Sequence, residues 1–69
     1  MKNGKNMEEK SINNLVILDY STGEVHIYKV QEDKEIDSIY LDSLGHNPDD
    51  CYYMVGQFIN IIDHRNEIN

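Results

Sequence analysis

The segment from Gly45 to Cys51 carries more reactive side chains than any other stretch of this chain. It holds an imidazole (His46), two carboxylates (Asp49 and Asp50) and the only thiol in the sequence (Cys51). Imidazole, carboxylate and thiolate are the usual protein ligands of transition metals, and a thiol beside an imidazole can also become a nucleophile. His46, Asp49, Asp50 and Cys51 are therefore the candidate metal ligands.

The spacing of these residues argues against a metal site. Four residues separate His46 from Cys51, which matches no zinc signature, and a closed site also needs His26 or His64. A calcium loop is excluded because Cys51 stands where an oxygen ligand is required. The simpler interpretation makes His46 a polar loop residue and Cys51 a small core residue, while the two aspartates form turn or cap hydrogen bonds. We therefore predict no metal, cofactor or catalytic residue, and a metal- or ligand-binding loop is the alternative.

Other catalytic patterns are missing from the sequence. The glycines Gly4, Gly23, Gly45 and Gly56 lie too far apart to cradle a phosphate, and no serine sits in a nucleophile elbow. We expect a protein that is not an enzyme.

The charge of the chain is uneven. Residues 11–69 contain eleven carboxylates against Lys29, Lys34 and Arg65, whereas residues 1–10 contain three lysines against two glutamates. An acidic surface repels phosphate backbones, so direct nucleic-acid binding is disfavoured. A second alternative follows from the same charge, namely an acidic inhibitor from a mobile element that mimics nucleic acid.

The length of 69 residues allows a single small domain. We expect a tail at residues 1–13, an α+β domain at residues 14–64 and a frayed end at residues 65–69. Without a long apolar run or a secretory signal pattern, the sequence predicts a cytoplasmic protein with no membrane contact.

Residues 15–30 have the pattern of a β-hairpin. Two apolar runs, 15–18 and 25–28, flank a predicted three-residue loop at 21–23, in which Gly23 takes a positive φ. This loop pairs Tyr20 with Glu24 and Leu18 with His26. The hairpin is then apolar on both faces, so it needs a second layer or a second copy of the chain to cover it.

A helix is predicted at residues 34–44 on one face of the hairpin. Asp33 is the expected N-cap, Gly45 is the expected stop, and Ile36, Ile39, Tyr40 and Leu44 form the apolar stripe.

Residues 51–62 fit either a strand or a helix. Asn47 and Pro48 suit both a turn and a helix start, but the aromatic and β-branched residues and Gly56 favour strand. In that case Phe58, Ile59, Ile61 and Ile62 complete the core.

Tyrosine is the main aromatic residue, and it is common in interface cores because its ring packs while its hydroxyl bonds. Adjacent tyrosines such as Tyr52 and Tyr53 point to opposite faces of a strand. The candidate interaction residues are Tyr20, His26, Tyr28, Tyr52 and Tyr53.

Residues 17–28 and 44–54 resemble segments of small uncharacterised bacterial proteins, found as short hypothetical proteins in gut anaerobes. The resemblance implies a compact bacterial domain and brings no activity with it. The favoured interpretation is a non-enzymatic protein–protein interaction module with an N-terminal β-hairpin, one amphipathic helix packed on a small antiparallel sheet and a C-terminal strand region. Its expected partner is another protein or a second copy in a homodimer.

Overall fold

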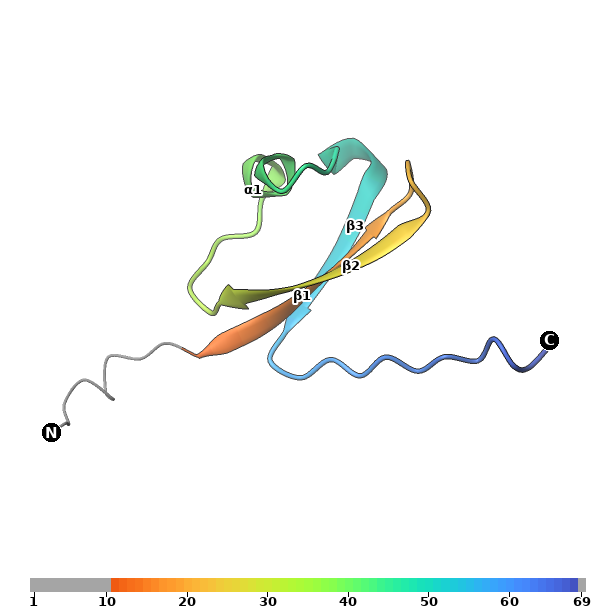
Figure 1. Cartoon of the computed structure of the whole chain (residues 1–69). Helices are drawn as coiled ribbons and strands as arrows, with labels where there is room; N and C mark the ends of the chain where they lie inside the picture. The colour runs from red at the N-terminus through yellow and green to blue at the C-terminus, as the bar shows by residue number, and fades with distance from the viewer. Residues whose placement is uncertain (1–10, 69) are drawn as a thin grey trace, which may run out of the picture.

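The fold is a three-stranded antiparallel sheet with one short helix, an α+β arrangement (Figure 1). A computed structural model describes residues 11–68. Strand β1 (Ile12–Asp19) lies in the centre, between β2 (Glu24–Gln31) and β3 (Cys51–Gly56). Helix α1 (Ser38–Ser43) and the 3-10 turn η2 (Pro48–Asp50) connect β2 to β3. Of the tail expected at residues 1–13, residues 1–10 lie outside the described part, and residues 12 and 13 belong to β1.

The hairpin register differs by one residue from the prediction. Asp19 pairs with Glu24 and Ile17 with His26, so the loop has four residues instead of three. The reason lies in Asp19, because its side chain accepts hydrogen bonds from the backbone N–H groups of Ser21 and Thr22 and begins the turn one residue earlier. The positive φ of Gly23, +74°, is confirmed.

This register defines two faces of the sheet. We call inner the face that carries Asn13, Leu15, Ile17, Asp19, Glu24, His26, Tyr28, Val30, Cys51, Tyr53 and Val55. We call outer the face that carries Ile12, Asn14, Val16, Leu18, Val25, Ile27, Lys29, Gln31, Tyr52, Met54 and Gly56. Tyr52 and Tyr53 therefore point to opposite faces, as predicted.

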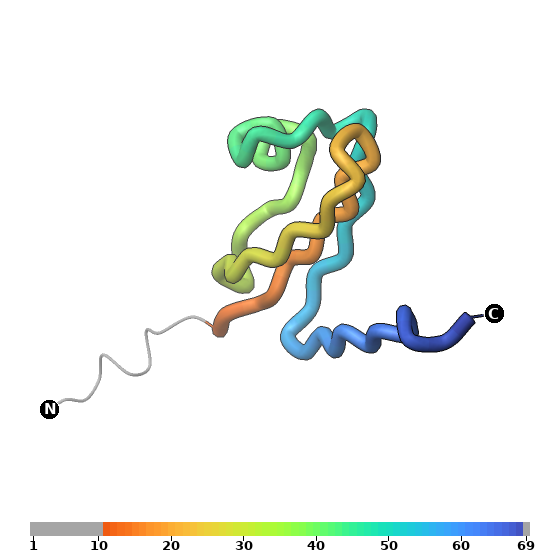
Figure 2. The backbone as a smooth tube through the Cα atoms, turned by 45° about the vertical axis from the view of Figure 1, so that its right-hand side comes forward, coloured from red at the N-terminus to blue at the C-terminus, as the bar shows by residue number. Residues whose placement is uncertain are grey.

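The core lies on the inner face. Figure 2 shows α1 and the segments that flank it on one side of the sheet. Leu15 and Ile17 are fully buried, and Val30 and Leu41 complete the centre. Around it pack the partly buried side chains of Tyr28, Ile36, Tyr40, Leu44 and Cys51.

Helix α1 is shorter than predicted. Its N-cap is Asp37 instead of Asp33, and the Asp37 carboxylate accepts the N–H of Tyr40 at 2.9 Å. Residues 31–34 form a turn instead, in which the Lys34 N–H donates to the Gln31 carbonyl. The buried stripe also differs from the prediction, because Leu41 is buried while Ile39 is 77% exposed. The stop at Gly45 is confirmed, with φ +91°.

The favoured strand at the C-terminal end is confirmed only for Cys51–Gly56. Phe58, Ile61 and Ile62 are exposed, so the prediction that they complete the core was wrong. The ladder with β1 ends where Gly56 pairs with Asn14, close to the start of β1, and little partner strand remains beyond it. The chain then leaves the sheet without further strand or helix up to residue 68 (Figure 1). Within residues 11–68, no helix is long and apolar enough for a membrane span.

Candidate functional site

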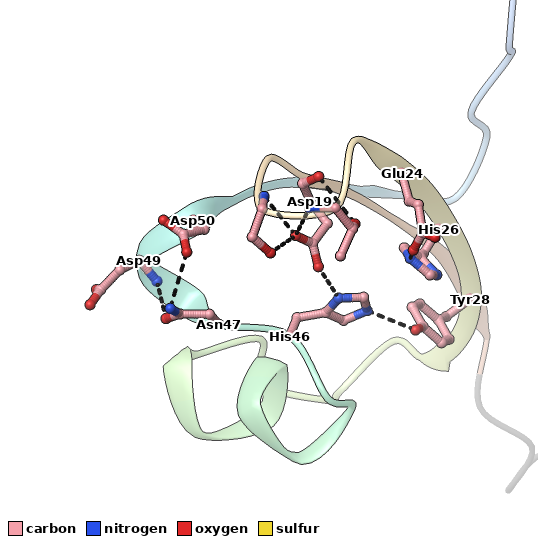
Figure 3. A network of polar contacts seen from close by, with 10 residues as sticks. Asp19, Glu24, His26, Tyr28, His46, Asn47, Asp49 and Asp50 are labelled. Carbon is pink, nitrogen blue, oxygen red and sulfur yellow. Dashed lines mark hydrogen bonds and ion pairs between the residues drawn. The ribbon is translucent and has the colours of Figure 1, made fainter.

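Asp19 and His46 form a buried polar pair at one end of the inner face (Figure 3). Their exposed fractions are 4% and 5%, and Nδ1 of His46 lies 2.8 Å from Oδ2 of Asp19. An ionised carboxylate only accepts hydrogen bonds, so Nδ1 carries the proton. In the neutral imidazole Nε2 then accepts from the hydroxyl of Tyr28, 2.9 Å away. The three side chains form one continuous hydrogen-bonded chain.

The second oxygen of Asp19 is held by the hairpin turn. Oδ1 accepts the hydroxyl of Ser21 at 2.6 Å, the N–H of Ser21 at 3.0 Å and the N–H of Thr22 at 3.3 Å. The hydroxyl of Ser21, followed by the imidazole of His46, keeps the pKa of Asp19 well below its usual value. Asp19 is therefore an ionised carboxylate whose two oxygens face different partners.

Cys51 lies beside this pair because it is the cross-strand partner of Asp19. One ligand atom each from Asp19, His46 and Cys51 lies within 4.8 Å of the others. Burial, followed by the negative charge of Asp19, raises the pKa of the Cys51 thiol. A thiol in this environment is protonated at neutral pH, so it is not an activated nucleophile.

The structure brings together two of the four candidate metal ligands of the Gly45–Cys51 segment. His46 and Cys51 do converge, and His46 is a polar loop residue as the simpler interpretation made it, but its ring is buried. The sequence missed the carboxylate that joins them, Asp19, which is distant in the chain. The one sequence signal for Asp19 was its position between an apolar strand and a Ser-Thr-Gly turn.

Asp49 and Asp50 lie apart from this cluster, in η2, where they form the predicted cap contacts. The side-chain carbonyl of Asn47 accepts the N–H of Asp49, and its amide donates to the carboxylate of Asp50, each at 3.1 Å. These contacts fix the turn that leads into β3 (Figure 3).

The other two histidines have different surroundings. His26 is half-buried, its Nε2 lies 2.9 Å from Oε1 of Glu24, and its ring stands at 65° to the His46 ring with centroids 4.6 Å apart. His64 is exposed and contacts Glu67 at 3.4 Å. His26 therefore belongs to the wall of the buried cluster, and His64 does not.

The candidate interaction residues divide between the two faces. Tyr20 and Tyr52 are each 67% exposed and pack edge to face at 5.4 Å, next to the outer face. Tyr28 is bonded to His46, and the Tyr53 hydroxyl donates to the Ile36 carbonyl at 3.2 Å. Tyr53 is 45% exposed, so the first pair is the more exposed of these aromatic surfaces.

Comparison of this chain with protein families, with curated proteins and with solved structures finds no match.

Proposed function

We propose that the protein is a small, non-enzymatic interaction module that associates with a second copy of itself through the outer face of the sheet. The observation that carries this proposal is the composition of that face. Of its apolar side chains, Ile12, Leu18, Val25, Ile27, Tyr52 and Met54 are between 38% and 67% exposed. An apolar patch of this size is often an interaction surface.

The distribution of charge favours a second copy of the chain as the partner that binds the outer face. The sequence has thirteen carboxylates, yet none stands at a strand position of the outer face, where Lys29 is the only charged residue. Two copies of a strongly acidic chain repel each other wherever their carboxylates meet. The outer face is a surface on which two copies can meet without that repulsion.

The size of the patch sets the expected affinity. Six large, partly exposed side chains offer on the order of 500 Å² of apolar surface, compared with about 800 Å² per partner in a standard interface. Two sheets can stack about 10 Å apart, with their side chains interdigitated. We therefore expect a two-fold dimer of micromolar stability.

The test is the mass of the protein in solution, measured by sedimentation equilibrium over a concentration series. The wild-type chain should form a dimer, and I27K and M54K should be monomers. Lysine is chosen because it lowers the net negative charge, so dissociation cannot come from added overall repulsion. The matched control is I39K, which places the same charge on an exposed isoleucine of α1 and should leave the dimer intact.

Two outcomes contradict the proposal. One is a wild-type chain that stays monomeric at 100 μM and above. The other is a dimer that survives both I27K and M54K, which would move the contact to a strand edge. Far-UV circular dichroism confirms that each variant is folded before its mass is interpreted.

A further inference from the structure

We propose that Asp19, His46 and Cys51 bind a single divalent transition-metal ion, with zinc as the best-suited metal. The three side chains supply one oxygen, one nitrogen and one sulfur atom, all within 4.8 Å of one another. Zinc accepts this donor set in tetrahedral geometry, with bonds of about 2.0 to 2.3 Å. Three protein ligands leave a fourth position for water.

The fold brings the ligands together from three separate places. Asp19 ends β1, Cys51 begins β3 directly opposite, and His46 follows α1. The backbone N–H of His46 donates to the Leu41 carbonyl at 3.0 Å, which fixes the loop that carries the ring. The ligand positions are therefore determined by the sheet register and the helix stop, and not by a flexible loop alone.

Hydrogen bonds from neighbouring residues orient two of the three ligands, Asp19 and His46. Oδ1 of Asp19 is occupied by Ser21 and Thr22, which leaves Oδ2 directed at the imidazole (Figure 3). The far nitrogen of that imidazole contacts the Tyr28 hydroxyl. Metal-binding histidines and carboxylates characteristically have such partners, which orient the ligand atom. A metal ion would replace the direct contact between Asp19 and His46.

The protons balance through Tyr28. For Nδ1 of His46 to bind the metal, its proton must leave that nitrogen and the neutral ring must carry one on Nε2 instead. The Tyr28 hydroxyl then accepts from Nε2–H where it previously donated, since a hydroxyl can do both. The thiol of Cys51 loses its proton to solvent when its sulfur binds. Binding of one metal ion to the neutral imidazole therefore releases one proton.

The experiment is titration of the tag-free, reduced full-length protein with Zn²⁺ and, in parallel, with Co²⁺. We expect one metal ion per chain by native mass spectrometry, one proton released per ion in weakly buffered solution, and a thiolate-to-cobalt charge-transfer band. The band requires a cobalt–sulfur bond, and Cys51 is the only cysteine. It tests the wild-type chain directly, so the result does not depend on any variant folding.

Variants assign the ligands. C51S should bind Zn²⁺ at least 100-fold more weakly and lose the cobalt band, and Y28F should weaken binding about tenfold while the band remains. D49N and H64Q are matched controls, because they remove a carboxylate and an imidazole outside the cluster, and they should bind as the wild type does. Absence of Zn²⁺ binding at micromolar concentration, a cobalt complex without the charge-transfer band, or unchanged binding by C51S would each overturn the proposal.

Discussion

The two faces of the sheet both contain many apolar residues, yet they differ in their content of ionisable side chains. Every carboxylate, histidine and thiol of the three strands lies on the inner face, namely Asp19, Glu24, His26 and Cys51. The outer strand positions contain no such group. This separation of ionisable from apolar side chains agrees with the different surroundings of the two faces.

The inner face is covered by the chain itself. Helix α1 and its flanking segments bury the centre of this face, where polar groups must bond to one another, as Asp19, His46 and Tyr28 do. On the outer face Val16 is buried, but the other apolar side chains of the described strands are 38% to 67% exposed. A carboxylate there would hinder the proposed contact with another acidic chain. The buried centre of the inner face therefore suits the proposed metal site, whereas the exposed outer face suits the proposed dimer contact.

The largest expected difference between the faces comes from truncating the same residue type on each. Ile17 is fully buried and Ile27 is 52% exposed. I17A should lower the free energy of unfolding by about 2 to 5 kcal/mol, through lost burial and a cavity. I27A should lower it by less than about 1 kcal/mol.

The comparison is made by urea unfolding with chelator present, at concentrations where the chain is monomeric. Equal losses for the two variants would show that the outer face is covered within a single chain. In that case the described faces would not differ as the structure indicates.

A second difference concerns acid. Folding lowers the pKa of Asp19, so the carboxylate stabilises the folded state above the pKa of the unfolded chain, and this contribution is lost as the pH falls. The free energy of unfolding should be level above about pH 5 and decrease progressively below about pH 4. D19N should be less stable at neutral pH and show a smaller decrease in acid.

The control for D19N is D42N, which removes the same charge from an exposed position of α1. It should keep both the neutral stability and the acid dependence of the wild type. Chelator is again present, so that bound metal does not enter the measurement. If the unfolding free energy of D19N depends on pH as that of the wild type does, the acid sensitivity comes from a residue other than Asp19.

The sequence predicted the elements better than the contacts. The hairpin, the helix stop at Gly45 and the strand at Cys51 follow from local preferences, because turn residues and β-branched runs act over a few neighbours. The register did not, because the side chain of Asp19 closes the turn one residue early, and a shift of one residue exchanges the faces of a strand relative to its partner.

The candidate site depended on that register. The predicted register paired His26 with Leu18, which lies on the outer face. His26 was therefore expected on the face opposite to Asp19, whereas it lies on the same face. The contact between Asp19 and His46 spans 27 positions in the chain, and no local pattern specifies it. His46 and Cys51 could be selected by residue type, but their third partner required the sheet.

The smallest expected difference between the faces concerns two tyrosine hydroxyls. The Tyr28 hydroxyl bonds to the buried ring of His46, so Y28F should lower the free energy of unfolding by about 0.5 to 1.5 kcal/mol. Tyr52 is 67% exposed, and its hydroxyl has no hydrogen bond to the described residues, so Y52F should leave the stability unchanged. Both variants keep the ring, which limits the change to one oxygen atom, and urea unfolding at neutral pH with chelator measures it. An equal loss of unfolding free energy for Y52F and Y28F would mean that the Tyr52 hydroxyl also has a hydrogen-bond partner. The two faces would then not differ in the hydrogen bonding of their tyrosines.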